Sequence, residues 1–257
     1  MAAASPIYLD YQATTPLAPE AYAAMLPWLG GPESAGGWAN PHSAHLLGRK
    51  ASAAVEVARG QIDALMPKGG RVIFTSGATE ALNLAIRGAL PALAPRRRIV
   101  TIATEHAAVR DTCLWLEAQG HDVVLLPVDC DGLVDMPAAR AAITPDTALV
   151  AAMLVNNEIG VIQPIEVLSD LAHAAGALFV CDAVQGFGRV ALPQAADMIA
   201  VTAHKIHGPK GIGALWVREG TALEPLIHGG GQEQGLRSGT LSPALCAGFG
   251  AAAKLAA

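Results

Sequence analysis

The chain has 257 residues, of which 52% are hydrophobic and 15% are charged, so a large apolar core can form. Its net charge of -5 argues against binding to nucleic acid, which calls for basic patches. Residues 1–6 lack the basic region and apolar run of a signal peptide, and no apolar stretch is long enough to span a bilayer. The four cysteines show no CxxC pair and no disulfide framework. We therefore expect a cytoplasmic protein with no metal site.

Hydrophobic periodicity and turn residues predict strands that alternate with helices along the whole chain. In chain order we predict helix 16–29, helix 43–66 with Ser43 as its cap, strand 71–75, a helix that opens at 76–80, strand 99–103, helix 107–119, strand 123–126, helix 137–142, strand 148–155, helix 165–175, strands 178–181, 198–201 and 214–217, and helix 242–257.

The predicted strands are continuous apolar runs, which is typical of a sheet buried on both faces. Their alternation with helices predicts an α/β fold with a mostly parallel sheet. The loop before strand 214–217 is too short for a crossover helix, so this strand should run antiparallel to at least one neighbour.

Polar side chains follow five of the predicted strands, at the point where each strand ends. Ligands of open α/β sheets bind at these carboxyl ends. Each residue alone has an ordinary explanation as a cap, a turn residue or a solvated side chain. Five exits that meet at one sheet edge instead favour a binding site, formed by Gly77, Ala78 and Thr79, by Glu105 and His106, by Asn156, Asn157 and Glu158, by Asp182 and Gln185, and by Thr202, His204 and Lys205.

Lys205 differs from the other four lysines because it directly follows an apolar strand and lies between His204 and His207. A charged, unpaired lysine at such a position is costly. One use of a lysine there is a Schiff base with a carbonyl cofactor such as pyridoxal phosphate. A lone loop lysine is usually a surface residue, so this assignment depends on the remaining strand exits.

The requirements of pyridoxal phosphate match those exits. Its phosphate needs backbone N–H groups at a helix N-terminus and hydroxyls, which Gly77, Ala78 and Thr79 can supply. Its pyridine nitrogen needs a carboxylate, and Asp182 follows a buried strand. We further expect Asn156 and Gln185 to bond the ring oxygen, and His106 to stack on the ring.

A set of motifs along nearly the whole chain resembles the cysteine desulfurases, which are fold-type-I pyridoxal phosphate enzymes of the class-V aminotransferase group. These motifs are Tyr8-Leu9-Asp10-Tyr11-Gln12-Ala13-Thr14-Thr15-Pro16, Asn40-Pro41-His42-Ser43, Phe74-Thr75-Ser76-Gly77-Ala78-Thr79-Glu80, Thr104-Glu105-His106, Val155-Asn156-Asn157-Glu158-Ile159-Gly160, Asp182-Ala183-Val184-Gln185, His204-Lys205-Ile206-His207-Gly208-Pro209-Lys210-Gly211 and Arg237-Ser238-Gly239-Thr240.

The resemblance implies the three-layer large domain of fold type I and a site that contains pyridoxal phosphate. It implies Lys205 as the covalent attachment and proton carrier, with His106 as a second catalytic residue stacked on the ring. It places Asp182 at the pyridine nitrogen, Asn156 and Gln185 at the ring oxygen, and Gly77, Ala78, Thr79, Thr202 and His204 around the phosphate. Thr240 would reach the phosphate of a neighbouring subunit, so the resemblance implies a homodimer that acts on L-cysteine and passes sulfur to an acceptor or scaffold protein.

The chain departs from this family at its C-terminal end. We expect an N-terminal segment 1–15 and a large domain 16–257, without the small domain that carries the nucleophilic cysteine and a carboxylate-binding arginine. We assign none of Cys113, Cys130, Cys181 and Cys246 as nucleophile, because three lie in predicted helices or strands and Cys130 lies between two carboxylates. Two alternatives stay open: a pyridoxal phosphate lyase that needs no protein thiol, and a catalytically inactive partner protein.

Overall fold

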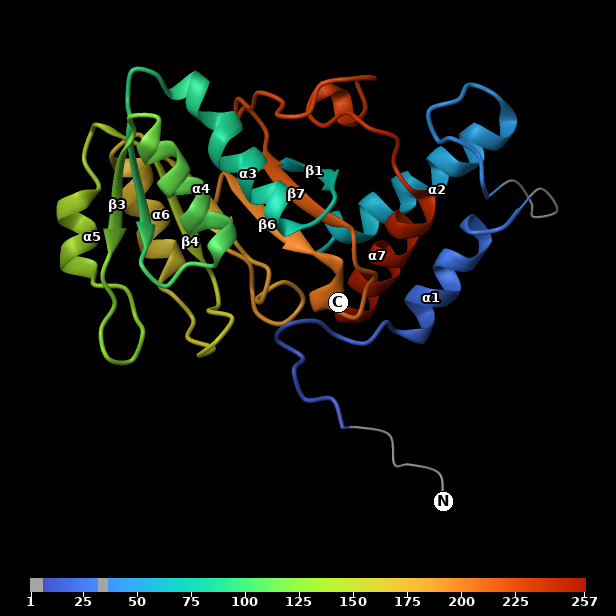
Figure 1. Cartoon of the computed structure of the whole chain (residues 1–257), viewed down its shortest axis with the longest axis horizontal. Helices are drawn as coiled ribbons and strands as arrows, with labels where there is room; N and C mark the ends of the chain where they lie inside the picture. Colours follow the sequence, from blue (N-terminus) through green and yellow to red (C-terminus); the bar gives the residue numbers. More distant parts are fainter. Residues whose placement is uncertain (1–6, 32–36) are drawn as a thin grey trace.

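The predicted apolar strands form one seven-stranded sheet in the computed structural model, which describes residues 7–31 and 37–257 (Figure 1). The strands are β1 (Gly70–Thr75), β2 (Arg98–Ile102), β3 (Asp122–Leu126), β4 (Thr147–Met153), β5 (Leu178–Asp182), β6 (Met198–Thr202) and β7 (Gly213–Arg218). The α-helices are α1 (Pro19–Met25), α2 (Leu46–Asp63), α3 (Ala78–Ala89), α4 (Ala107–Ala118), α5 (Met136–Ala142), α6 (Ile165–Ala174) and α7 (Pro243–Ala256). Short 3-10 helices are Leu26–Trp28, Leu90–Leu93, Ala203–Lys205 and Glu233–Gly235.

The strand order is β1-β7-β6-β5-β4-β2-β3. The pairs from β6 through β5, β4 and β2 to β3 are all parallel, whereas β7 is antiparallel to both β6 and β1. The predicted mostly parallel sheet with one antiparallel strand is therefore confirmed. This topology brings the carboxyl ends of β1, β2, β4, β5 and β6 to the same edge of the sheet.

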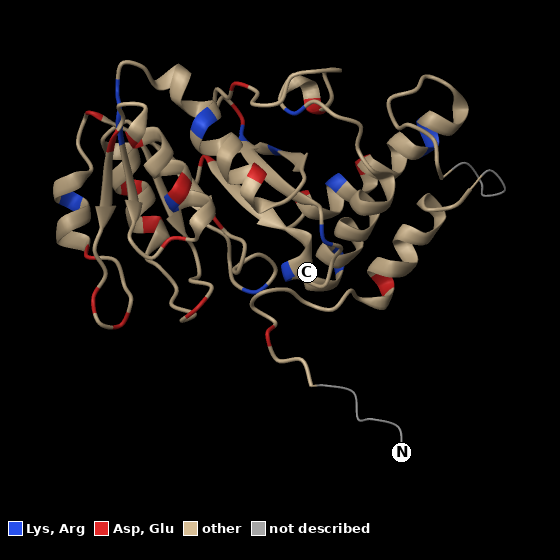
Figure 2. Ribbon diagram, in the orientation of Figure 1, with Lys and Arg blue, Asp and Glu red and all other residues tan. Residues whose placement is uncertain are grey.

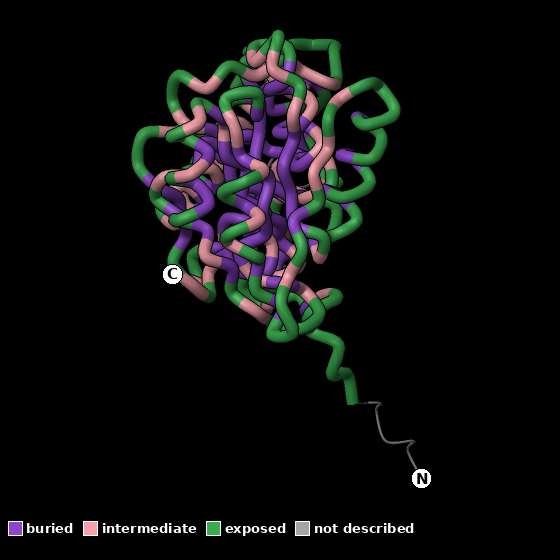
Figure 3. The backbone as a smooth tube through the Cα atoms, turned by 90° about the vertical axis from the view of Figure 1, so that its left-hand side faces the viewer, coloured by how far each residue is buried: buried purple, intermediate pink, exposed green. Residues whose placement is uncertain are grey.

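Helices cover both faces of the sheet and give a three-layer α/β sandwich. One apolar cluster joins α3 and α4 to one face, through residues such as Leu82, Val109 and Leu149. A second cluster joins α1, α2, α5, α6 and α7 to the opposite face, through residues such as Ile62 and Phe179. Figure 3 shows the sheet as the buried centre of the molecule, with exposed loops at its margins. The three-layer prediction is thus confirmed.

Small residues allow the C-terminal helix to lie against α2, as Figure 1 shows. A Cβ atom added to Gly250 on α7 would lie 2.7 Å from the Cα of Ala58 and 2.3 Å from Oε1 of Gln61 on α2. Glycine therefore sets the close approach of these two helices. Pro243 at the start of α7 and the Ser242 side chain, which accepts a hydrogen bond from Leu245 N at 3.3 Å, fix where this helix begins.

Two predicted helix boundaries were wrong. The prediction 16–29 is split, because α1 ends at Met25 and a 3-10 turn around Pro27 follows. The cap of α2 is His45, whose Nδ1 accepts a hydrogen bond from Gly48 N at 3.1 Å, and not Ser43. Ser43 instead lies in a turn in which its N–H donates to Asn40 O at 3.1 Å.

Charged residues of both signs lie mainly outside the sheet interior, and Figure 2 shows acidic residues on the loops that follow β3 and β4. None of the helices in the described part of the chain has the length and apolarity to cross a membrane.

Of the predicted N-terminal segment 1–15, residues 1–6 lie outside the described residues. Residues 7–15 contact the loop after β6, through the hydrogen bond from Thr15 N to His204 O at 2.9 Å. The division into segment 1–15 and domain 16–257 stays a prediction.

Candidate active site

A cavity of about 450 Å³ opens at the carboxyl edge of the sheet. Nearly all the strand-exit residues predicted to form a site line it, together with two residues of the N-terminal segment. The predicted residues in its lining are Gly77, Ala78, Thr79, His106, Asn157, Asp182, Gln185, Thr202, His204 and Lys205. The sheet topology therefore brings together side chains that are more than 120 positions apart in the sequence.

The N-terminus of α3 forms one wall of the cavity. Gly77 is its cap and Ala78 its first residue, and the first N–H groups of an α-helix have no acceptor within the helix. A Cβ atom on Gly213 of β7 would lie 2.6 Å from the carbonyl carbon of Gly77, so glycine there allows the turn to lie against the sheet. Free N–H groups and the helix dipole make this wall suited to an anion such as a phosphate.

Asp182 ends β5 and is buried, with 6% of its surface exposed. Its Oδ1 accepts a hydrogen bond from Val184 N at 3.0 Å. Burial raises the pKa of Asp182, while that hydrogen bond and the charges of His106 and Lys205 oppose the rise. No lysine, arginine or histidine among residues 7–31 and 37–257 forms an ion pair with this carboxylate, which is therefore available to a protonated ring nitrogen.

Glu105 lies next to this carboxylate and is 4% exposed. Its Oε1 accepts a hydrogen bond from Met153 N at 2.6 Å, and its Oε2 is buried without a hydrogen-bond partner among the described residues. Burial raises the pKa of Glu105 well above its ordinary value, and the negative charge of Asp182 raises it further. The sequence placed Glu105 at a strand exit but indicated no role for it.

Lys205 follows β6 and its Nζ donates a hydrogen bond to the backbone carbonyl of Gln12. The same carbonyl accepts from Gln185 Nε2 at 2.9 Å. Burial lowers the pKa of Lys205, and the charge of Asp182 partly opposes that effect. A lowered pKa increases the fraction of neutral amine, which is the nucleophilic form.

Two histidines border the cavity with their Nδ1 atoms already engaged. His106 caps α4, because its Nδ1 accepts a hydrogen bond from Ala108 N at 3.1 Å. A neutral His106 ring with Nδ1 as acceptor carries its proton on Nε2. His204 Nδ1 lies 3.2 Å from Thr14 Oγ1, and burial, followed by the charges of Lys205 and Lys210, lowers its pKa.

Four predicted residues do not line the cavity: Glu105 and Glu158 of the strand exits, and Asn156 and Thr240, which were predicted to bind the cofactor. Asn156 is buried below it: its Nδ2 donates to Thr104 O at 3.0 Å, and its Oδ1 accepts from the backbone N–H groups of Glu158 and Ile159. The neighbouring Asn157 lines the cavity instead. Thr240 is exposed on the segment before α7 and lies outside the lining.

Sequence reasoning also missed residues that the fold brings to the cavity. Ala13 and Thr14 line it from the N-terminal segment, and Lys210 lines it from beyond the turn at Pro209. The available signals were the threonine pair at 14–15 and the two lysines in one short loop. Neither signal shows from sequence alone that both segments fold toward the same opening.

The thiols lie away from this cavity. Cys113, Cys181 and Cys246 are buried and Cys130 is exposed. Burial raises the pKa of Cys113 and of Cys246 to about 12, and it also raises the pKa of Cys181. Within residues 7–31 and 37–257, no cluster of three or more histidine, cysteine or acidic residues could hold a metal ion.

Comparisons with known proteins agree with this geometry. The cysteine desulfurase IscS of Rickettsia bellii is 46% identical over 259 residues, which cover 98% of this chain and 62% of that protein. A cysteine desulfurase of Cereibacter sphaeroides is 49% identical over 256 residues, covering 97% and 65%. The structure of SspA in complex with cysteine superposes with a TM-score of 0.89 at 40% identity, covering 97% of this chain and 72% of that one.

The chain spans about three fifths of the length of these curated relatives. The sequence profile of the family described as aminotransferase class-V matches residues 7–257, and the enzymes of this family depend on pyridoxal phosphate. With the profile matched over almost the whole chain, and with Lys205 and Asp182 on neighbouring strand ends of one cavity, the protein belongs to the class-V aminotransferase family.

Proposed function

We propose that this chain forms the pyridoxal phosphate-binding large domain of a cysteine desulfurase. Such an enzyme removes sulfur from L-cysteine, giving L-alanine and persulfide sulfur for iron–sulfur cluster or thiocofactor assembly. The observation that carries the proposal is the shared cavity of Lys205, Asp182 and the N-terminus of α3. Relatives named cysteine desulfurase and the likeness to a protein bound to cysteine support it.

The residues of the cavity divide into groups that fit different parts of the cofactor. The N-terminus of α3, with Thr202 and His204, would hold its phosphate. Asp182 would hold its ring nitrogen and Gln185 its ring oxygen, while His106 would lie against the ring. When bound, the cofactor supplies an electron sink, which a carboxylate at the ring nitrogen strengthens.

The protein's own contribution is to orient the groups and to move protons. Lys205 would attach the cofactor and, once released, would accept and return a proton at Nζ; its lowered pKa increases the fraction of neutral amine that can accept the proton. His106 Nε2 is the other atom that can carry a proton, because helix capping engages Nδ1 and fixes the ring. Both side chains are thus positioned for proton transfer before substrate enters.

The exposed position of Thr240 suits a contact with a second copy of the chain. We propose a homodimer in which Thr240 of one subunit reaches the phosphate site of the other, and a sulfur-acceptor or scaffold protein that receives the product. The cytoplasmic location expected from the sequence stays a prediction.

The attachment of the cofactor tests the proposal directly. Purified protein incubated with pyridoxal phosphate should turn yellow, and borohydride reduction should fix the label to the peptide that contains Lys205. Lys205→Ala should lose this label completely. Lys210→Ala is the matched control, since Lys210 also lines the cavity, and it should keep the label. A label on Lys210, or none in the unaltered chain, contradicts the proposed function.

A further inference from the structure

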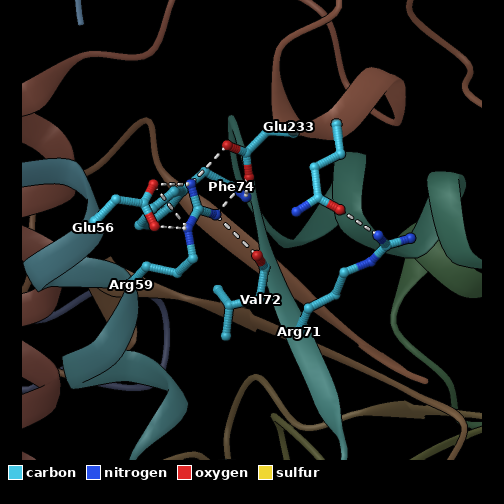
Figure 4. Close-up of polar contacts among 7 residues, drawn as sticks. Glu56, Arg59, Arg71, Val72, Phe74 and Glu233 are labelled. Atoms are coloured by element: carbon cyan, nitrogen blue, oxygen red, sulfur yellow. Dashed lines mark hydrogen bonds and ion pairs between the residues drawn. The ribbon is translucent and has the colours of Figure 1, made fainter. Parts of the chain in front are cut away.

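The free edge of β1 is covered by side chains instead of by another strand. Among the described strands, β1 pairs only with β7. On its other side, Val72 O accepts a hydrogen bond from Arg59 Nη1 at 2.9 Å, and Phe74 N donates to Glu233 Oε2 at 2.7 Å (Figure 4). A guanidinium and a carboxylate thus provide the donor and the acceptor that a further strand would offer.

Arg59 and Glu233 also bind each other in a two-point contact. Nη1 of Arg59 lies 2.7 Å from Oε2 of Glu233, and Nη2 lies 2.8 Å from Oε1. The Glu233 side chain is only 3% exposed, and the Arg59 guanidinium packs over the Phe74 ring at 4.8 Å. A second carboxylate, from Glu56, contacts the outer side of the same guanidinium at 3.1 Å. A buried, bidentate pair of this kind fixes geometry in a way that exposed ion pairs do not.

The backbone that presents Glu233 is in an uncommon conformation. Glu233 has a φ of 49° and Gln234 a φ of 58°, in the left-handed region that non-glycine residues rarely adopt. Gln234 is held in turn by Arg71, whose Nη1 donates to its Oε1 at 2.5 Å. Such backbone persists where surrounding contacts determine it, and it clusters at functional sites.

A second ion pair joins the same short segment to α3. Arg237 Nε donates to Glu80 Oε1 at 2.7 Å, and Arg237 Nη2 donates to Oε2 at 3.2 Å. Glu80 Oε2 also accepts a hydrogen bond from Ser76 N at 2.6 Å. Segment 233–237 therefore contacts the chain around Gly77 at two places. Glu233 binds the backbone N–H of Phe74, and Arg237 binds Glu80 of α3, which in turn accepts from Ser76 N.

We propose that Arg59 and Glu233 form a positioning pair that sets the geometry of the anion-binding turn 75–79. Neither residue lines the cavity, so the pair acts through β1 and segment 233–237. The inference rests on the proposed function, because it assumes that the N-terminus of α3 receives the cofactor's phosphate. It adds a residue pair far from the reacting atoms that controls binding of this one part of the cofactor.

Comparing pyridoxal phosphate with pyridoxal, which lacks the phosphate, tests the proposal. Glu233→Gln keeps the side-chain shape and removes the charge that Arg59 grips. Its affinity for pyridoxal phosphate, measured by absorbance titration, should fall about 10-fold, because a small misplacement of binding groups is costly. Its affinity for pyridoxal should stay within about 2-fold of the unaltered chain, because the turn would contact only the phosphate, which pyridoxal lacks.

Asp197→Asn is the matched control. Asp197 is also a buried carboxylate that accepts a strand N–H, from Phe179 at 2.7 Å, but it lies directly before β6, at the amino ends of the parallel strands. This variant should leave the ratio of the two affinities unchanged. If Glu233→Gln does not fold, Arg59→Lys is the second variant, because it keeps the charge and removes the two-point contact. It should lower the ratio of the affinity for pyridoxal phosphate to the affinity for pyridoxal.

The outcomes separate the two proposals. Equal losses for both ligands, or an unchanged ratio in folded Glu233→Gln, overturn the positioning role and leave the proposed function standing. An unaltered chain that binds neither ligand, or binds both equally, overturns the proposed function and the positioning role together.

Discussion

Asp182 and Asp197 are two buried carboxylates at the carboxyl and amino edges of the same part of the sheet, and they differ in their hydrogen-bond partners. They are 6% and 8% exposed. Asp197, at the amino edge, has an Oδ2 that accepts from Phe179 N at 2.7 Å and contacts His173 Nε2 at 2.8 Å. Asp182, at the carboxyl edge, has one hydrogen bond from Val184 N, and burial raises its pKa.

The difference in hydrogen-bond partners indicates that polar groups at the amino edge stabilise the fold, whereas those at the carboxyl edge are available to a ligand. The backbone at the amino edge is bonded within the chain, for example by Arg218 Nη2, which donates to Ala196 O at 2.8 Å, although the buried Nε1 of Trp216 has no hydrogen-bond partner among the described residues. At the carboxyl edge, Glu105 Oε2 has no partner and Asp182 faces a cavity. Buried polar groups are normally satisfied, and three of the five buried side-chain atoms without a partner in the described part of the chain belong to Thr101, Thr104 and Glu105, at the end of β2 or directly after it, which favours a binding site at this edge.

Removing the charge of Asp182 should have the largest effect on function. Asp182→Asn keeps the shape but loses the charge-assisted bond to a ring nitrogen, which is worth about 1.5–3 kcal/mol. We expect the affinity for pyridoxal phosphate to fall about 10- to 100-fold, while the free energy of unfolding without cofactor stays equal or rises. Absorbance titration and urea unfolding measure the two quantities. Unchanged affinity would remove Asp182 from the site.

The corresponding change at the amino edge should have the opposite profile. Asp197→Asn can keep an oxygen at the position of Oδ2, which contacts both Phe179 N and His173 Nε2, but it removes the negative charge that strengthens both contacts. We expect the free energy of unfolding to fall by about 2 kcal/mol. Affinity for pyridoxal phosphate in the folded variant should match that of the unaltered chain. A loss of affinity like that of Asp182→Asn would show that the two edges are not functionally distinct.

Much of this contrast could be predicted from the sequence. Continuous apolar runs identified the strands, and the polar residue after each run identified the edge that collects side chains such as Asp182 and Lys205. The short loop before β7 predicted its antiparallel direction. These features depend on local pattern and chain direction, both of which the sequence carries.

Contacts between distant segments could not be predicted in this way. Asn156 and Asn157 are adjacent and chemically identical. Asn157 lines the cavity because the turn after β4 directs the Asn156 side chain to backbone groups instead. The Arg59–Glu233 pair joins residues 174 positions apart, and a single sequence shows no pairing between them. His45, and not Ser43, caps α2 because the turn at Asn40 engages the backbone N–H of Ser43.

The smallest expected effect concerns Glu105, which belongs to the carboxyl edge but does not line the cavity. Because its pKa is raised, the folded chain holds a proton at pH values where the unfolded chain has released it. The associated stability is complete below the ordinary glutamate pKa of about 4.3 and is lost as pH rises through the raised pKa. Burial is the main cause, and the charge of Asp182 adds to it.

Glu105→Gln removes this titration while its amide oxygen can still accept the N–H of Met153. We therefore expect the free energy of unfolding without cofactor to rise for the variant relative to the unaltered chain as pH rises from 4 to 8, because only the unaltered chain loses the proton at residue 105. Glu117→Gln, at an exposed position of α4, is the control and should follow the unaltered chain. Parallel pH curves for Glu105→Gln and the unaltered chain would mean that burial at the carboxyl edge does not raise the pKa of Glu105 in the folded chain.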